Sequence, residues 1–129
     1  MLKLAIVGSR QISEMGVLTD ALSRVRNLSW FDTIVSGGAE GVDTLARQFS
    51  EERGLKLIEF LPDYKQFGKK APLVRNTDIV KTADVVLAIP LRGGSKGTWD
   101  SINKAVKLGK KVYVFEVFPS SKMGIMKEM

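Results

Sequence analysis

The stretch Ser-Gly-Gly-Ala-Glu-Gly-Val-Asp at residues 36–43 decides the fold. It follows a short apolar run at 33–35 and leads into apolar residues with helical spacing. These are Val42, Leu45, Ala46 and Phe49. The glycines let the backbone turn tightly beside the start of the helix, where N–H groups carry partial positive charge. The stretch therefore predicts a strand, a turn that accepts an anion, and a helix.

The rest of the chain repeats this alternation. Other short apolar runs lie at residues 2–7, 55–60, 84–89 and 111–117. Apolar residues with helical spacing lie between them, within 18–28, 73–80 and 102–106. The order predicts an α/β fold, a Rossmann-like three-layer sandwich with a parallel five-stranded sheet of order 3-2-1-4-5 and helices on both faces. We expect one domain at residues 1–117 and a C-terminal tail at 118–129 without periodicity.

The composition excludes several kinds of site and catalytic mechanism. The 129 residues include no cysteine and no histidine, which excludes disulfides, thiolate zinc sites and catalysis by a thiol or an imidazole. No metal site and no cofactor is predicted, since the GxxxxGK[ST] spacing of a triphosphate cradle is absent. The net charge of +6 favours anionic partners. The apolar run at 2–7 is too short to span a membrane, so we expect a cytoplasmic protein with no membrane partner.

Three turns are expected at one edge of the sheet, because the carboxyl ends of parallel strands meet there. Besides 36–43, Gly8, Ser9 and Arg10 follow the first strand, and the glycine-rich residues 90–98 follow the fourth. Ligands of such sheets bind at this edge, where the strand order reverses. The three turns therefore predict one shared ligand site.

Polar side chains of these turns suit a phosphate. Ser36 and Ser95 offer hydroxyl donors, and Thr98 can cap the helix that follows while offering its own hydroxyl. Either Arg10 or Arg75 fits as a bidentate clamp on a phosphate.

Three other residues have less certain roles in this pattern. Asp43 is either a partner of the helix dipole or an acceptor for a ligand hydroxyl, with about equal weight. Trp99 lies just inside the last turn, where packing in the core or against a subunit is favoured over stacking on a base. Trp30 is expected to pack in the core or at an edge.

Residues 36–46, the pair Arg75 and Asn76, and residues 93–98 together resemble the SLOG superfamily, which includes lonely-guy phosphoribohydrolases and the DNA-processing protein A (DprA) fold. The chain is most similar to the short YspA-like branch, whose first strand ends in Gly-Ser-Arg. The resemblance implies a nucleotide-binding Rossmann-like domain that forms homo-oligomers. It also implies a set of pocket residues: Gly8, Ser9, Arg10, Gly37, Gly38, Asp43, Arg75, Asn76, Gly94, Ser95, Gly97 and Thr98.

One position departs from the lonely-guy pattern PGGxGTxxE. Ser101 stands where those enzymes have a glutamate that helps cleave the N-glycosidic bond. A carboxylate is needed there because the sugar develops positive charge as the base leaves. If the chain is an enzyme, Arg75 and Asp100 are the candidate catalytic residues, with Asp43 or Glu40 as other sources of the carboxylate.

Three functions follow from this pattern. The first is binding or sensing of a nucleotide or a nucleotide-derived small molecule through the glycine-rich turns. The second is hydrolysis of the N-glycosidic bond of nucleoside monophosphates. The third is binding of single-stranded DNA, suggested by the basic charge and the DprA resemblance, although no aromatic platform outside the core is expected.

Overall fold

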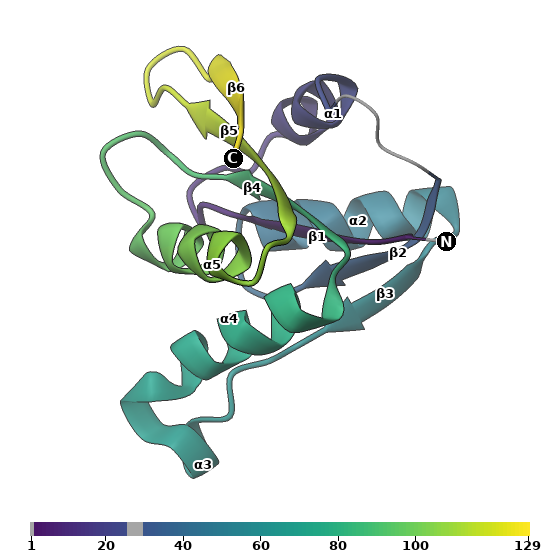
Figure 1. Cartoon of the computed structure of the whole chain (residues 1–129). Helices are drawn as coiled ribbons and strands as arrows, with labels where there is room; N and C mark the ends of the chain where they lie inside the picture. The colour runs from purple at the N-terminus through teal and green to yellow at the C-terminus, as the bar shows by residue number, and fades with distance from the viewer. Residues whose placement is uncertain (1, 26–29) are drawn as a thin grey trace.

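A computed structural model describes residues 2–25 and 30–129 of the chain. Its six strands form one sheet of order β3-β2-β1-β4-β5-β6 (Figure 1). The first five pair in parallel, and β6 pairs antiparallel to β5. The strands are β1 (Leu2–Gly8), β2 (Phe31–Ser36), β3 (Lys56–Glu59), β4 (Val85–Ile89), β5 (Lys111–Val117) and β6 (Gly124–Glu128).

Helices cover both faces of the sheet. They are α1 (Met15–Ser23), α2 (Val42–Arg53), α3 (Tyr64–Phe67), the 3-10 helix η1 (Gly68–Lys70), α4 (Ala71–Thr82) and α5 (Lys96–Lys107). Because side chains alternate along a strand, β1 supplies a core on each face. Leu4 and Ile6 pack with residues of α1 and α2, whereas Ala5 and Val7 pack with residues of α4 and α5.

The predicted α/β fold is confirmed, with its five parallel strands in the order 3-2-1-4-5. The sheet extends further than predicted, because residues 124–128 of the tail form β6. This edge strand has mostly exposed residues, so its sequence carries little of the apolar alternation by which strands are recognised. Antiparallel pairing with β5 nevertheless supplies its backbone hydrogen bonds.

The helices also differ from the prediction in part. The first was expected to span residues 18–28 but ends at Ser23, and Leu28 lies outside the described residues. The short helices α3 and η1 were not predicted, because single turns have no periodicity to detect. Trp30 was expected to pack, but it is 83% exposed. Trp99, in the first turn of α5, packs against the core between the sheet and the helices α4 and α5, as favoured.

No helix among residues 2–25 and 30–129 is both long enough and apolar enough to cross a membrane. Within the same residues, no three acidic, histidine or cysteine side chains gather as a metal site would require.

Candidate functional site

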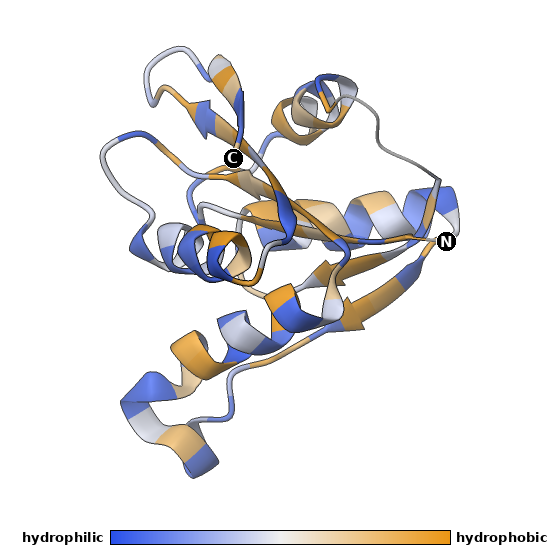
Figure 2. Ribbon diagram, in the orientation of Figure 1, coloured by the Kyte–Doolittle hydropathy of each residue, from blue (hydrophilic) through white to orange (hydrophobic). Residues whose placement is uncertain are grey.

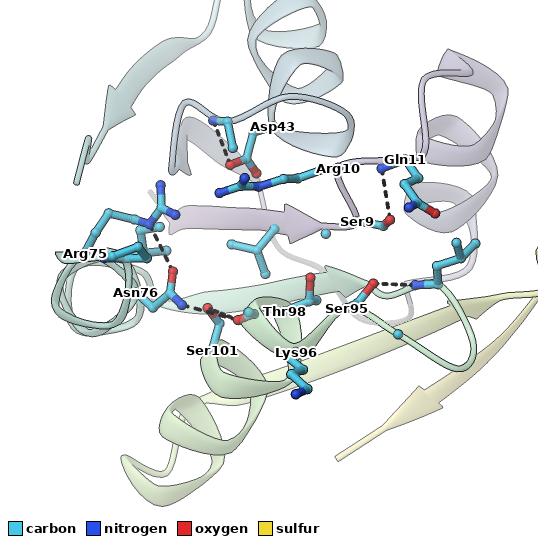
Figure 3. Close-up of a pocket in the computed structure, with 18 of the residues that line it drawn as sticks. Ser9, Arg10, Gln11, Asp43, Arg75, Asn76, Ser95, Lys96, Thr98 and Ser101 are labelled. Carbon is cyan, nitrogen blue, oxygen red and sulfur yellow. Dashed lines mark hydrogen bonds between the residues drawn. The ribbon is translucent and has the colours of Figure 1, made fainter. Parts of the chain in front are cut away.

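A cavity of about 360 Å³ opens at the carboxyl ends of β1 and β4 (Figure 3). The strand order reverses between these two strands, so the cavity lies where α/β sheets bind ligands. Ten of the residues predicted for the site line it: Gly8, Ser9, Arg10, Asp43, Arg75, Asn76, Gly94, Ser95, Gly97 and Thr98. Turns that are far apart in the sequence thus converge on one space.

A second cavity, of about 270 Å³, adjoins the first. The two share Arg10, Ala39 and Arg75 in their linings. Gly37 and Gly38, which the sequence also assigned to the site, line this second cavity rather than the first. Ser36 lines neither, since it is fully buried at the end of β2, where its carbonyl oxygen accepts a hydrogen bond from the Phe60 N–H at 2.9 Å.

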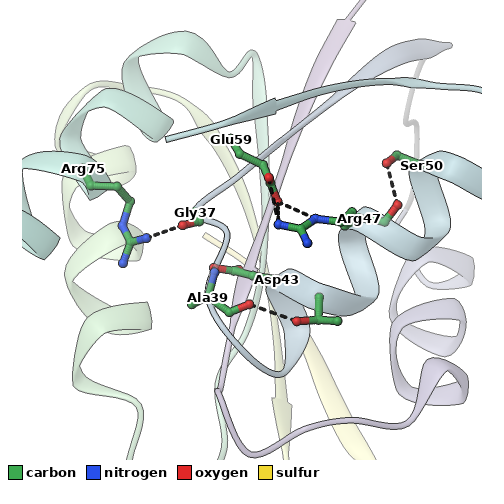
Figure 4. Close-up of polar contacts among 8 residues, drawn as sticks. Gly37, Ala39, Asp43, Arg47, Ser50, Glu59 and Arg75 are labelled. Atoms are coloured by element: carbon green, nitrogen blue, oxygen red, sulfur yellow. Dashed lines mark hydrogen bonds and ion pairs between the residues drawn. The ribbon is translucent and has the colours of Figure 1, made fainter. Parts of the chain in front are cut away.

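The turn before α2 is held by side chains from the first turn of that helix (Figure 4). The carboxylate of Asp43 accepts a hydrogen bond from the Ala39 N–H at 3.1 Å, and the Thr44 hydroxyl donates to the Ala39 carbonyl at 3.1 Å. The Asp43 carboxylate thus satisfies one donor of the turn, as a dipole partner in the first turn of α2 would. It also lines the first cavity, so both interpretations of this residue keep a structural basis.

Close packing explains two glycines of this turn. A Cβ on Gly41 would overlap the Ser9 carbonyl oxygen and the Arg10 backbone, and Gly41 has a φ of +73°. A Cβ on Gly37 would lie 2.5 Å from Nη1 of Arg75. Gly41 therefore lets the turns after β1 and β2 meet, and Gly37 leaves room for the Arg75 side chain.

Arg75 and Asn76 on α4 tie the two glycine-rich turns together. Arg75 donates through Nη1 to the Gly37 carbonyl at 2.6 Å and through Nε to Oδ1 of Asn76 at 3.0 Å. Asn76 in turn donates through Nδ2 to the Gly97 carbonyl at 3.3 Å. Both side chains are buried, and this chain of hydrogen bonds fixes the distance between the turns across the cavity.

Charges around the cavity favour an anion. Burial raises the pKa of Asp43, while the Ala39 N–H and the charge of Arg75 act to lower it. Burial likewise lowers the pKa of Arg75, and the Asp43 carboxylate acts to raise it. An arginine stays protonated across the physiological range despite such a shift. Arg10, which is exposed and also lines the cavity, extends toward these two residues in Figure 3 and adds a second positive charge.

The turn before α5 is open. Ser95 has a φ of +66°, and its hydroxyl oxygen accepts a hydrogen bond from the Leu91 N–H at 3.0 Å. No side chain caps α5, and its first turn holds no acidic residue. Thr98 was predicted to cap this helix, but the N-cap position belongs to Ser95 and Thr98 lies within the first turn. The first N–H groups of a helix lack partners inside it, so those of α5 remain able to bind an anion.

Comparison with known proteins identifies the family. The model of the YspA, cpYpsA-related SLOG family (YAcAr) matches residues 2–67, a stretch that includes the turns after β1 and β2. The chain belongs to this family. The Gene 61 protein of Mycobacterium phage D29 is 34% identical to it over 122 residues, which cover 89% of this chain and 97% of the phage protein.

A similar fold is seen in a solved structure of DNA processing protein A from Helicobacter pylori. That structure comes from a study of how the Helicobacter protein binds single-stranded DNA. The two chains superpose with a TM-score of 0.64 and are 25% identical. The match covers 88% of this chain but 64% of the Helicobacter chain, so this protein spans less than two thirds of that relative. The resemblance to the SLOG superfamily and its YspA-like branch is therefore confirmed.

The cavity does not bring the two candidate catalytic residues together. Arg75 lines the first cavity, but Asp100 does not. The Asp100 carboxylate instead accepts from Nδ2 of Asn76 at 3.1 Å and pairs with Nζ of Lys104 at 2.8 Å. Ser101, at the position of the lonely-guy glutamate, is buried and lines the cavity. One residue along a helix turns a side chain by about 100°, which explains why Ser101 and not Asp100 faces the ligand space.

Sequence reasoning missed several lining residues. Gln11 follows Arg10 directly, and its N–H donates to the Ser9 hydroxyl at 3.1 Å. Leu73 and Ile79 add apolar surface from α4. The spacing of α4 indicated only a helix, and which of its residues face the cavity depends on how the helix lies against the sheet.

Proposed function

We propose that this SLOG protein binds a nucleotide or a nucleotide-derived ligand in the cavity between the turns after β1 and β4. One observation carries the proposal: Arg10, Arg75 and the uncapped start of α5 surround the same space. Two guanidinium groups and a helix N-terminus are strong partners for a phosphate. In this arrangement the phosphate lies against residues 94–98, with Arg10 closing over it.

The remaining lining suits the rest of a nucleotide. The volume of 360 Å³ falls within the roughly 300–1,000 Å³ of small-molecule sites. Leu73, Ile79 and Leu91 offer apolar surface for a base, and the Asp43 carboxylate is an acceptor for a sugar hydroxyl. A few polar groups that fix orientation within an apolar lining are typical of such sites.

Binding is the function we propose, rather than cleavage of an N-glycosidic bond. A glycosidase needs a carboxylate at the sugar, and Asp100 is engaged by Asn76 and Lys104 outside the cavity. Asp43 is the carboxylate that lines it, but it already accepts a hydrogen bond from the turn. Incubation with nucleoside monophosphates should therefore release no free base detectable by chromatography.

Calorimetric titration with nucleoside monophosphates and ADP-ribose tests the proposal. We expect binding by the wild-type protein and an affinity about 10- to 100-fold weaker for Arg10→Gln, the usual effect of losing a charged hydrogen bond. The matched control is Arg53→Gln, which removes the same charge at the far end of α2, where Arg53 stacks on Phe49. If no compound binds, or if both variants lose affinity equally, the proposal is wrong.

A second candidate function is binding of single-stranded nucleic acid. Similarity to DNA processing protein A, which binds single-stranded DNA, supports it. The net charge of +6 is of the sign that a polyanion requires.

Self-association and a cytoplasmic location, both expected from the sequence, stay predictions. Light scattering of the purified protein measures the first directly.

A further inference from the structure

The segment from Leu61 to Lys70, which includes α3 and η1, projects from the body of the domain between β3 and α4 (Figure 1). We call it the α3 arm. Its fold is locally specified, since Oδ1 of Asp63 caps α3 by accepting from the Gln66 N–H at 3.1 Å. The arm starts beside the site, because Pro62 lines the second cavity with Arg10 and Arg75.

Large apolar side chains are exposed on this arm. Leu61 is 66% exposed, Tyr64 58% and Phe67 39%. Three large apolar side chains exposed within one short segment form a local apolar patch, and such patches are typical of interaction sites. The exposed rings of Tyr64 and Phe67 are able to stack on flat rings of a partner.

Lysines alternate with these rings. Lys65, Lys69 and Lys70 are exposed, and none of them pairs with a carboxylate among residues 2–25 and 30–129. Figure 2 shows hydrophilic and hydrophobic segments following one another along the arm. Asp63 is the one acidic residue of the arm, and its carboxylate is engaged in capping α3.

The charge of the arm identifies the class of partner. A second copy of the chain docked arm to arm would bring six lysines together, a repulsion that disfavours self-association through this surface. An acidic protein surface would pair the lysines, but its carboxylates would not stack on the two rings. A single-stranded nucleic acid supplies both, with phosphates at regular spacing and unstacked bases between them.

We propose that the α3 arm binds single-stranded nucleic acid, with Tyr64 and Phe67 stacking on bases and with Lys65, Lys69 and Lys70 contacting phosphates. This inference rests on the second proposed function for the class of ligand, and it does not require the nucleotide cavity. Tyr64 and Phe67 are exposed, whereas the sequence led us to expect no aromatic platform outside the core.

Fluorescence anisotropy with a labelled 12-nucleotide oligo(dT) tests the arm on the full chain. Tyr64→Ala combined with Phe67→Ala should weaken binding by about tenfold or more, as loss of base stacking does. Tyr64→Phe keeps the ring and should bind like the wild type. Trp30→Ala is the matched control, because Trp30 is an exposed aromatic residue just before β2, at the opposite end of the strands from the arm.

The lysines are tested by salt dependence. Changing Lys65, Lys69 and Lys70 to Gln should reduce the slope of log affinity against log salt by about 2, since each phosphate contact on a single strand contributes about 0.7. The control changes Lys56, Lys107 and Lys127 to Gln, three exposed lysines on other elements, and so alters the net charge equally. A similar fall in slope for both triple variants would show a diffuse effect of charge and overturn the arm assignment.

The outcomes separate the two proposals. If the wild-type protein binds no oligonucleotide, both the second candidate function and the arm assignment are wrong. If it binds but the Tyr64 and Phe67 double variant binds equally well, the second function stands and the arm assignment fails. Light scattering of the same double variant completes the test, since loss of a dimer without loss of DNA binding would assign the arm to self-association.

Discussion

The two glycine-rich turns look alike in sequence but are built differently. The turn at residues 37–41 is closed, because the carboxylate of Asp43 binds its Ala39 N–H and Arg75 binds its Gly37 carbonyl. The turn at 93–97 also has a side chain on one carbonyl, since Asn76 binds that of Gly97, but its N–H side is open. No side chain caps α5, and no atom lies within 4 Å of a Cβ placed on Gly94 or Gly97.

Because of this difference, glycine has a different role in each turn. In the closed turn, glycine lets backbone segments approach one another, so the requirement comes from the fold. In the open turn, Gly94 and Gly97 do not have the positive φ that favours glycine, and no neighbouring atom excludes a side chain. Both residues line the cavity, so a side chain at either position would occupy space that we propose for the ligand. The open turn is thus the better candidate for direct contact with a phosphate.

The largest expected effect tests the closed turn. Gly41→Ala places a Cβ against the Ser9 carbonyl oxygen and the Arg10 backbone at a φ of +73°. Because backbone atoms cannot move aside as a side chain can, we expect the free energy of unfolding to fall by about 3 kcal/mol or more. Urea denaturation monitored by circular dichroism measures this change in the free energy of unfolding.

Gly54→Ala is the control for this prediction. Gly54 also has a positive φ, +65°, but its Cβ would meet no atom within 4 Å. The free energy of unfolding of Gly54→Ala should fall by only about 1 kcal/mol, the cost of the left-handed conformation alone. Equal losses for the two variants would mean that close packing of the turns contributes nothing, and the contrast between closed and open turns would lose its basis.

Sequence patterns were sufficient for the parallel core and for the convergence of the predicted turns on one cavity. Buried strands and amphipathic helices have strong periodicity, and the positions of Gly8, Ser36 and Ile89 at strand ends fix which turns share an edge. Sequence patterns could not distinguish the two turns, because a Gly-Gly pair is identical in sequence whether a side chain or a ligand closes the turn. The hydrogen bond from Arg75 to Gly37 joins residues 38 positions apart, and no local pattern encodes it.

The α3 arm and β6 escaped prediction for a related reason. Periodicity identifies elements that bury one face, and the arm from Leu61 to Lys70 buries very little. Tyr64 and Phe67 are three residues apart, a spacing that indicates a buried helical stripe as readily as an exposed one. Only the absence of packing around them reveals that they face solvent.

A smaller effect concerns Asp43, whose carboxylate closes the first turn. Its pKa is raised in the folded protein, mainly by burial, so the folded state binds a proton more tightly than the unfolded chain. This group therefore favours folding at low pH, and its contribution is lost as the pH rises from the ordinary aspartate pKa of 3.8 through the raised pKa of the folded state. Asp43→Asn removes that dependence, because the amide does not titrate while its oxygen can still accept from Ala39.

Denaturant unfolding of the wild type and Asp43→Asn at a series of pH values measures the difference. The wild type should gain stability relative to the variant as the pH falls toward 3.8, by less than the effect of Gly41→Ala. A wild type that loses stability relative to Asp43→Asn on acidification would show that the carboxylate is stabilised as an anion, and that hydrogen bonding in the closed turn outweighs burial.

The smallest change in stability is expected in the open turn. Gly97 is the second residue of α5, and alanine is the better helix former, so Gly97→Ala should leave the free energy of unfolding unchanged or raise it by up to about 1 kcal/mol. The added methyl group nevertheless occupies space beside the first N–H groups of α5, where we place the phosphate. Nucleotide affinity should therefore fall by about tenfold or more in calorimetry while stability holds, since even a small displacement lengthens every charged hydrogen bond at once. A loss of stability without a loss of affinity would make this turn structural like the first, and the phosphate would then have to be placed at Arg10 and Arg75 alone.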